Sequence, residues 1–576
     1  MHYVRFGRAE GRDPRPEAAN GRAVAAPIST PSPAPAEGAG PPPSSVLTPQ
    51  LRATLEEEFD PNYYLASYPD VQDAGMDPLE HYFNFGCREG RNPTPDFSTS
   101  YYLLANPDVA RGEVNPFAHY VLAGKSEGRR ARAPGGLKRE TLEHLRSVDE
   151  EMDHWREHFP PVDTPMDEAS LTRLLVERVG TRRHVVLSCS HDNYMTNAGG
   201  VQLVVKLEQA AFVERGCAYL NLHPAQLLPV LSRETEPEAL ALALVCDGET
   251  LGIATADAVL GALAHLGSEG VDFGLVVHAL HGHSPEVIAE LYERLEPRWA
   301  WLWLHDFFVV CPSTTLLRNK IEACHAPPPD SAGCTICVYG EERLRHIERW
   351  RELLDKVPFE FVAPSQFMAK RWKEYMAKPD LAVTVQAYGA VTRTEADTAD
   401  VDPGHPPVDG PVRIAFPGQG FHKGWETFRE LVRRYAPTGD YRFFHFGDGG
   451  YSEPHLEARK VSVVETGPLA MIDAFRADAI DLVVVWSIWE ETFCYTAHEA
   501  FVAGAAVLTQ EGSGNVATVV RESGNGLVFA DEQELFDAFE SGSILEFAHS
   551  RRSSPPHDPT TFVYSNMTAD LVSVDD

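Results

Sequence analysis

The sequence predicts an α/β protein in which two Rossmann-like domains follow a small helical repeat region. Short apolar runs alternate with amphipathic helical segments over residues 183–394 and again over 412–540, and this alternation is typical of doubly wound parallel sheets. A polar, Pro- and Gly-rich linker, 395–411, separates the two stretches, and a 38-residue repeat occupies residues 55–134. We expect the two domains to face each other across a cleft, where ligands bind in folds of this class.

Composition excludes several classes of function. A chain of 576 residues is too long for one ordinary domain. The formal net charge of −34 disfavours general binding to nucleic acid or to anionic membranes, because the far field repels phosphate. No apolar run is long enough for a transmembrane segment, and the first residues lack the apolar core of a secretory signal. Nine cysteines are too few for a disulfide scaffold, which predicts a reducing, cytoplasmic setting, with peripheral attachment to the inner membrane as an option.

The repeats share one sequence frame. Copies that start at Phe59 and Phe97 both read F-x3-YYL-x3-PDV, then P-[LF]-x-HY, then G-x2-EGR. Residues 1–14 match only the last third of this frame, so we expect the chain to begin inside a repeat, followed by a Pro/Ala-rich linker, 15–48. Each copy is predicted to form two short helices. The aromatic residues are either platforms that stack on carbohydrate or surfaces that pack one repeat on the next; they are Tyr63, Tyr64, Tyr82 and Phe85.

The first Rossmann-like domain follows a helical connector, 135–182. A Gly-Gly loop and a helix over 201–215 come after the first strand. Strands are expected at 184–190, 217–223, 273–280, 299–305 and 359–365.

The second Rossmann-like domain repeats the alternation. Helices are expected at 424–435, 468–477 and 495–504, and strands at 412–418, 441–447, 461–467, 481–487 and 505–510. The tail, 541–576, is polar, and its segment FVYSNMTADLV is predicted to form a last helix that docks on the first domain.

The strongest local pattern is EETFCYTAHEAFVAGAAVL (490–508), in which Glu491 and Glu499 enclose seven residues. One Glu in the loop before a helix and one inside that helix can both face the cleft. Carboxylates suit sugar hydroxyls, because a charged acceptor makes the stronger hydrogen bond. The alternative is an ordinary helix with two surface glutamates.

This segment resembles the E-x7-E signature of retaining GT-B glycosyltransferases of family four. Thr492 and Cys494 stand where that family usually has glycines, and Ala506 replaces a proline. The resemblance implies a GT-B fold in which Glu491 binds the donor sugar at the reacting centre and Glu499 binds the nucleotide ribose. The matching positions are Phe493, Glu499, Ala500, Ala503, Gly504 and Val507.

A second pattern, FPGQGFHKGWETF (416–428), follows a strand and opens a helix. A Gly-rich turn with a lysine at a helix N-terminus suits a pyrophosphate. The resemblance assigns Gly420 and Lys423 to the donor phosphates. The family usually has an Arg at the position of Gly418, so either His422 or Arg393 substitutes for it or donor binding is weak. An ordinary solvated lysine at a helix start is the alternative.

Two further patterns lie in the first domain. The segment NAGGVQ (197–202) resembles the family's GG-V loop, which implies that Gly199 and Gly200 let the backbone approach the donor phosphates. His305, at the end of a strand, resembles the histidine that touches the donor sugar or the reacting centre; His278, His281 and His283 compete for that role. An ordinary turn and packed core histidines are the alternatives.

Four cysteines cluster in one loop with the spacing C-x12-C-x9-C-x2-C: Cys311, Cys324, Cys334 and Cys337. This pattern fits a tetrahedral structural Zn2+ site, in which His325 could replace one ligand. Free buried thiols, a disulfide and a redox C-x2-C pair are the alternatives. No cofactor is expected to be required for catalysis.

The resemblance implies a retaining hexosyltransferase that uses a UDP- or GDP-linked sugar and a glycan acceptor in bacterial surface polysaccharide synthesis, with a polysaccharide-synthesis complex as a further partner. The 38-residue repeats resemble modules attached to bacterial polysaccharide glycosyltransferases. The main alternative is a non-catalytic GT-B-like protein that binds glycan or acts as a scaffold, and a GT-B sugar-nucleotide epimerase is the second.

Overall fold

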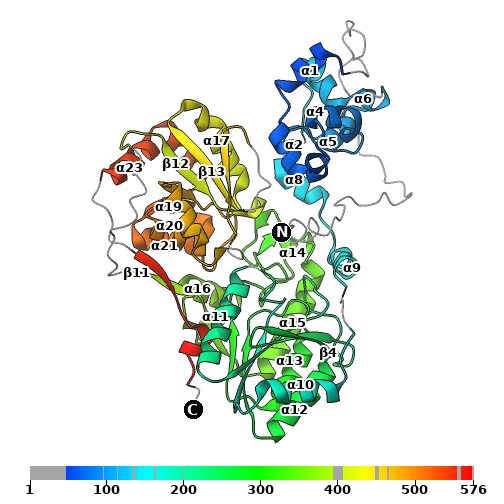
Figure 1. The fold of residues 1–576 in the computed structure, drawn as a ribbon, viewed down its shortest axis with the longest axis vertical. Helices are drawn as coiled ribbons and strands as arrows, with labels where there is room; N and C mark the ends of the chain where they lie inside the picture. Colours follow the sequence, from blue (N-terminus) through cyan, green and yellow to red (C-terminus); the bar gives the residue numbers. More distant parts are fainter. Residues whose placement is uncertain are drawn as a thin grey trace. The chain divides into compact units, whose positions relative to one another are not determined.

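A computed structural model describes residues 47–573, except for 95, 113, 133–135, 161–163, 198, 394–406, 419, 448–452, 463–465 and 554–559 (Figure 1). The predicted partial repeat 1–14, nearly all of the linker 15–48 and most of the linker 395–411 lie outside the described residues. The chain divides into two compact units. The described residues up to 139, together with 453, form the first unit, and the described residues of 140–447 and 454–573 form the second.

Each repeat of the first unit contains three short helices and a π-helical turn. In the first copy these are α2 (Pro61–Ser67), α3 (Pro69–Asp73), α4 (Pro78–His81) and η2 (Tyr82–Gly86), and in the second α5 (Thr99–Ala105), α6 (Pro107–Arg111), α7 (Pro116–His119) and η3 (Tyr120–Gly124). The prediction of two helices was wrong because a proline opens the middle helix as well, where its missing N–H costs nothing.

Most of the tyrosines named above pack inward, whereas Phe85 is 52% exposed. Tyr64 and Tyr102 are fully buried, and their hydroxyls lie 3.0 Å and 2.9 Å from Nδ1 of the histidine of their own repeat. A Cβ at Gly86 would lie 2.1 Å from the Tyr64 hydroxyl, and Gly124 stands in the same relation to Tyr102. The glycine of the G-x2-EGR frame is therefore required by the buried tyrosine, and the packing interpretation is confirmed for Tyr64 and Tyr82.

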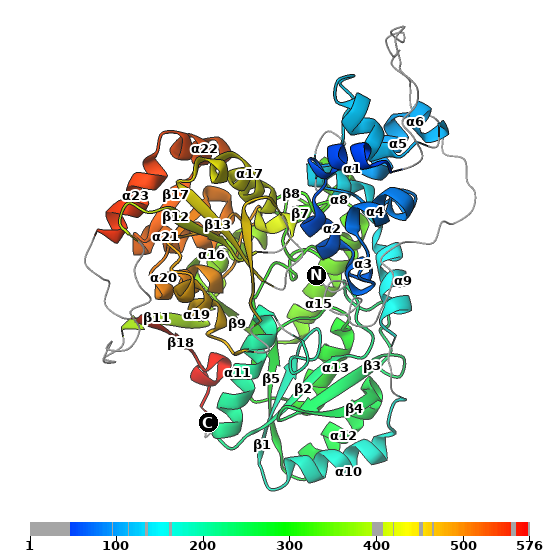
Figure 2. The ribbon, with the colours of Figure 1, turned by 45° about the horizontal axis from the view of Figure 1, so that its top comes forward.

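The second unit begins with helices α9 (Val148–His158) and α10 (Glu168–Val179) and contains an eight-stranded sheet with the order β10-β9-β6-β5-β1-β2-β3-β4 (Figure 2). We call this sheet and its helices the N-lobe. Its strands are β1 (His184–Cys189), β2 (Ala218–Pro224), β3 (Ala241–Cys246), β4 (Glu249–Thr255), β5 (Asp272–Val277), β6 (Ala300–Trp303), β9 (Glu360–Ala363) and β10 (Thr384–Val385).

The N-lobe sheet is parallel except for β3 and β4, an antiparallel hairpin that the strand prediction missed. Asp247 and Gly248 both have positive φ in its two-residue turn, the geometry that such hairpins favour. Alternate β1 residues enter different cores: Val185 and Leu187 pack with α12 (Ala256–Ser268) and α13 (Pro285–Leu295), whereas Val186 packs with α11 (Gly200–Glu214).

The C-lobe is a six-stranded parallel sheet with the order β14-β13-β12-β15-β16-β17. This is the doubly wound order in which the first strand lies at the centre. Its strands are β12 (Val412–Phe416), β13 (Tyr441–Gly447), β14 (Leu456–Lys460), β15 (Leu482–Val484), β16 (Ala506–Gln510) and β17 (Gly526–Phe529). Its helices include α17 (Trp425–Tyr435), α19 (Ala470–Ala477), α20 (Tyr495–Ala503), α21 (Asn515–Ser523), α22 (Glu532–Glu540) and α23 (Ser543–Arg552).

The predicted fold class, two Rossmann-like sheets after a small helical region, is confirmed. The strand next to β13 is β14, Leu456–Lys460, which lies before the strand expected at 461–467. The centre of that expected strand, 463–465, lies outside the described residues. The tail docks on the N-lobe as predicted, but it forms strand β18 (Thr560–Tyr564), antiparallel to β11 (Gly389–Arg393), and the 3-10 turn η7 (Met567–Asp570). In the described part of the chain, no helix is long and apolar enough to cross a membrane.

Candidate functional site

The loop after β15 carries Glu491, whose carboxylate is buried against the C-lobe. Ser487 Oγ donates a hydrogen bond to Glu491 Oε1 at 2.6 Å, and Lys423 Nζ lies 2.5 Å from the same oxygen. The backbone of Gly514 supports this loop so closely that a Cβ there would lie 2.7 Å from Glu490 Cα. The structure thus brings together two predicted donor-binding residues that are 68 positions apart.

Lys423 ends a short 3-10 turn, η4 (Phe421–Lys423), between two glycines with positive φ. A Cβ at Gly424 would lie 2.2 Å from Trp486 O, so only glycine fits at this approach, while Gly420 precedes the turn with a φ of +87°. Burial lowers the pKa of Lys423, but the adjacent Glu491 carboxylate outweighs this effect and raises the pKa above its usual value. The ammonium therefore stays charged at neutral pH and can hold an anion.

Glu499 lies in the middle of α20. Glu491, Lys423 and Glu499 are all close enough to Cys494 to influence the pKa of its thiol. Burial raises the pKa of Glu499 to about 7. Within the described residues, its carboxylate has neither a hydrogen-bond nor an ion-pair partner. A partly buried acid of this kind is available to a ligand hydroxyl.

The Gly-Gly loop of the N-lobe lies against the C-lobe. A Cβ at Gly200 would lie 3.7 Å from the ring of Tyr495, the first residue of α20. A Cβ at Gly199 would lie 2.2 Å from Gln202 Oε1, and Gln202 Nε2 donates to both carboxylate oxygens of Asp192 at 2.9 Å. A side chain at Gly199 would therefore displace Gln202, whereas at Gly200 a Cβ would make only an ordinary van der Waals contact with Tyr495.

His305 belongs to a buried chain of hydrogen bonds. His278 Nε2 lies 3.1 Å from Glu208 Oε1, His278 Nδ1 lies 2.9 Å from His305 Nε2, and His305 Nδ1 lies 2.5 Å from the Tyr388 hydroxyl. Because a carboxylate only accepts, His278 Nε2 donates to Glu208 Oε1. Burial holds the pKa of His305 well below its usual value, so the His305 ring itself is neutral at neutral pH.

Both ring nitrogens of His305 are engaged in this chain, so contact between its ring and a donor sugar stays a prediction. The tail takes part in these hydrogen bonds: Thr568 N donates to Glu208 Oε2 at 3.1 Å, and Trp303 Nε1 donates to Thr568 Oγ1 at 2.8 Å. Of the competing histidines, His281 stacks on Phe308 with 3.6 Å between ring centroids, and His283 Nε2 donates to Ser190 O at 2.7 Å.

Glu490, next to the predicted Glu491, is a functional candidate that sequence reasoning missed. Tyr375 donates its hydroxyl to Glu490 Oε2 at 2.5 Å, Arg371 Nη2 lies 3.0 Å from Oε1, and His325 Nδ1 lies 3.4 Å from the same oxygen. All three partners belong to the N-lobe, and two of them lie on α16 (Gln366–Tyr375). Glu490 therefore ties the Glu491 loop to the N-lobe.

Two more contacts join the lobes beside this loop. Ser365 Oγ donates to Thr492 O at 2.7 Å, and Thr492 Oγ1 donates to His305 O at 2.5 Å. The carboxyl ends of β6 and β9 thus meet the loop that carries Glu491. A hydroxyl at position 492, where the resembling family has glycine, is what makes the second contact.

Neither substitute expected for the missing Arg is placed beside Lys423 as a second cation. Burial, followed by the nearby Lys423 charge, lowers the pKa of His422 to about 3, so its ring is neutral at neutral pH. Arg393 ends β11, where it pairs with Thr560 of β18. The guanidinium that the structure places at this loop is that of Arg371, through Glu490.

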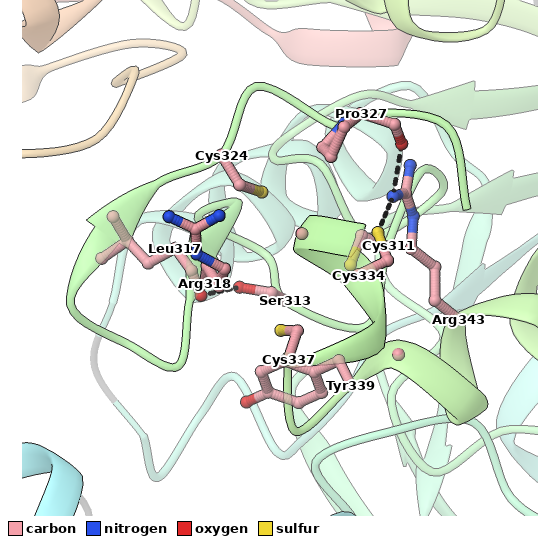
Figure 3. A pocket seen from close by; sticks show the side chains of 12 residues that line it. Cys311, Ser313, Leu317, Arg318, Cys324, Pro327, Cys334, Cys337, Tyr339 and Arg343 are labelled. Carbon is pink, nitrogen blue, oxygen red and sulfur yellow. Dashed lines mark hydrogen bonds between the residues drawn. The ribbon is translucent and has the colours of Figure 1, made fainter. Parts of the chain in front are cut away.

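The four clustered cysteines line one pocket with a cavity volume of about 20 Å3 (Figure 3). His325, the expected substitute ligand, points to Glu490 and is not part of the lining. In the described residues, no group of three or more His, Cys, Asp or Glu side chains is arranged to hold a metal ion. The zinc site therefore stays a prediction.

Residues 412–541 match the family model described as glycosyl transferases group 1, and no curated protein matches the sequence. Similar solved structures include sucrose-phosphate synthase from Thermosynechococcus elongatus, with 12% identity over 64% of this chain and 94% of that chain and a TM-score of 0.38. HepE from Anabaena, solved with UDP-glucose, has 12% identity over 64% of this chain and 92% of that chain, with a TM-score of 0.37. The catalytic domain of starch synthase IV from Arabidopsis thaliana, bound to ADP and acarbose, has 11% identity over 66% and 96%, with a TM-score of 0.36. The family match falls on the lobe that carries Lys423, Glu491 and Glu499.

Proposed function

We propose that this protein transfers a hexosyl group from a nucleotide sugar to a glycan acceptor. The observation that carries the proposal is the pairing of Lys423 with Glu491, within a segment similar to group 1 glycosyl transferases. A nucleotide sugar presents an anionic diphosphate beside a polyhydroxylated ring. An ammonium and a carboxylate in contact suit the two parts of that one ligand.

Each residue then has a defined task. Lys423, together with backbone N–H groups at the start of α11, holds the diphosphate and offsets the charge that develops as it departs. Glu491 accepts hydrogen bonds from hydroxyls of the hexose, and Glu499 accepts them from the ribose. Because the pKa of Glu499 is raised to about 7, ribose binding strengthens as pH rises through neutrality.

The resemblance to family four supports transfer with retention of configuration. In the proposed step, the bond from the anomeric carbon to the phosphate oxygen breaks while a bond to the acceptor oxygen forms on the same face. The acceptor proton passes to the departing phosphate, so no separate general base is required. The neutral edge of the N-lobe, at His305 and Tyr388, would border the acceptor. We further propose a cytoplasmic role in surface polysaccharide synthesis, with UDP- or GDP-linked sugar as donor and a synthesis complex as partner.

The test is turnover of a panel of UDP-, GDP- and dTDP-hexoses, with NMR of the product anomer. Glu491→Gln should lower turnover by at least about 100-fold, because an aligned charged group is lost at the reacting centre. Glu522→Gln, an exposed acid on α21, is the matched control and should retain activity. Equal background turnover in the wild type and Glu491→Gln would refute the transferase, and an inverted anomer would refute retention.

A non-catalytic glycan-binding or scaffold protein is the second candidate, and one observation favours it. Gly418 replaces the family's usual Arg, and a Cβ there would lie 2.8 Å from Phe416 Cζ and 3.0 Å from Lys423 Cβ. The local packing thus excludes a side chain at this position. Nucleotide-sugar binding without turnover in the panel would favour this candidate, and release of an epimeric sugar would favour an epimerase.

A further inference from the structure

The segment between β6 and α15 (Gly340–Lys356) contains little regular structure. It includes β7 (Leu317–Arg318), β8 (Glu322–Ala323) and the one-turn helix α14 (Ala332–Thr335). His325 and Ala326 both have positive φ, at 51° and 45°, a conformation that non-glycine residues adopt at a cost. A long connection with so little regular structure is usually functional or stabilised by further interactions.

The four cysteines of this segment lie around one space, as Figure 3 shows. Cys311 precedes the hairpin, Cys324 follows β8, and Cys334 and Cys337 lie at α14. The same pocket is lined by residues from both ends of the segment, including Ser313 and Gly340. The C-x2-C pair on a tight turn, together with two further thiols from separate strands of chain, is a ligand arrangement typical of structural zinc.

Arg343 of α15 supplies an independent observation. Its guanidinium is buried, and its Nη1 donates to Cys334 Sγ at 2.9 Å and to Pro327 O at 2.7 Å. Among the residues that the structure describes, no carboxylate lies within ion-pair distance of it. Arginine stays protonated in proteins, and a buried charge without a counter-charge is costly. An anionic occupant of the cysteine pocket would supply that counter-charge.

We propose that the four-cysteine pocket binds a structural Zn2+ through the thiolates of Cys311, Cys324, Cys334 and Cys337, with Arg343 as the compensating cation. Binding would turn the sulfurs toward the cavity by rotation about their Cα–Cβ bonds, since the side chains as they stand form no metal-holding group in the described residues. Zn2+ replaces the four thiol protons, which leave to solvent. The resulting centre carries two negative charges, which Arg343 partly offsets.

The zinc centre would also act on the candidate site. Cys324 directly precedes His325, whose Nδ1 lies 3.4 Å from Glu490 Oε1. Fixing Cys324 therefore fixes the residue that reaches from the cysteine segment to the loop of Glu491. This consequence rests on the proposed function, whereas zinc binding itself does not.

The experiment is metal analysis of the full chain, purified under reducing conditions from zinc-supplemented cells. We expect close to one zinc per chain, and a near-complete loss of zinc in Cys324→Ser and Cys337→Ser. Cys217→Ser, a buried cysteine outside the pocket, is the matched control and should keep the metal. Arg343→Met should bind zinc more weakly in competition with a chelator, because the counter-charge is lost.

A second measurement covers the case in which a serine variant fails to fold. Wild-type protein, stripped by chelator and reloaded with Co2+, should show the intense thiolate-to-metal absorption of a tetrahedral sulfur site. Hydrogen exchange over residues 313–337 should speed up on stripping and slow again on reloading. The proposal would be overturned if wild-type protein contains no zinc as purified and also fails to show that absorption when it is loaded with Co2+. A disulfide among the four cysteines in reduced protein would overturn it as well.

Discussion

The two lobes present different chemistry at the same kind of sheet edge. At the carboxyl edge of the C-lobe sheet, the polar groups are charged: Lys423 is paired with Glu491, and Glu499 is a nearby acid. At the carboxyl edge of the N-lobe sheet, His278 and His305 are hydrogen-bonded to each other, and burial holds the pKa of His305 well below its usual value. The difference teaches that local pairing, rather than the net charge of −34, decides what each edge can bind.

The largest effect is expected from removing the charge of Lys423 at the edge of the C-lobe sheet. Lys423→Ala should lower hexosyl transfer by about 1000-fold, because the departing diphosphate loses its main cation. It also leaves Glu491 without its ion-pair partner, so nucleotide binding should weaken as well. Steady-state kinetics and calorimetric titration with the preferred nucleotide measure the two effects.

Lys370→Ala, an exposed lysine on α16, serves as its control. Activity of Lys423→Ala within a few-fold of the control would show that the C-lobe edge does not bind the donor phosphates.

The next-largest effect is expected from a change in the buried hydrogen bonds at the edge of the N-lobe sheet. Glu208 is fully buried, and although burial raises its pKa, His278 and Thr568 lower it overall. Glu208→Ala should reduce the free energy of unfolding by about 3 kcal/mol, because His278, Tyr219 and the tail lose a shared buried acceptor. Chemical denaturation measures the loss, and Glu214→Ala, exposed on the same helix, is the control. Equal midpoints for the two variants would contradict the role of the buried chain.

A smaller effect tests the connection between the edges. Tyr375→Phe removes the hydroxyl that donates to Glu490 Oε2. The free energy of unfolding should fall by about 2 kcal/mol, which is in the range for hydrogen bonds to charged groups. The hydroxyl of Tyr292, on α13, has no partner among the described residues, so Tyr292→Phe should cost little. If thermal unfolding of the two variants does not differ, Glu490 does not hold the lobes together.

The smallest effect is a pH dependence that sharpens the comparison. The pKa of Glu499 is about 7 in the folded protein, against 4.5 when unperturbed, so its stabilising contribution is present below pH 4.5 and is lost as pH rises through 7. Glu499→Gln should therefore gain stability relative to the wild type at pH 8 but not at pH 4.5. Melting temperatures across this range measure the difference. A constant difference between the two proteins would show that Glu499 is ionised throughout.

Much of the fold could be predicted from the sequence, since strand and helix patterns are local. HVVLSCS and AAVLTQ became β1 and β16 because a short apolar run between turns has few other solutions. The β3–β4 hairpin was missed although Asp247-Gly248 signals such a turn. The strand that pairs with β13 lies at Leu456–Lys460, before the expected segment 461–467, because apolar residues alone do not decide where a strand pairs.

The candidate site was predictable only where a motif carried it. The sequence indicates Lys423, Glu491 and the glycines because turn chemistry and spacing are visible in the chain, and the structure places Lys423 beside Glu491. Glu490 was missed because two adjacent glutamates look alike in sequence, and only the fold turns one toward Arg371 and the other toward Lys423.

By itself, the sequence determined the alternation of strands and helices, the repeat frame and the motif residues, because periodicity and turn preference act over a few residues. Tertiary structure alone decided which distant groups meet: Lys423 with Glu491 across 68 positions, and Glu208 with Thr568 across 360. For Lys423 and Glu208 these partners outweigh the effect of burial on the pKa, since the free energy of a charge depends on what surrounds it and not on its place in the chain.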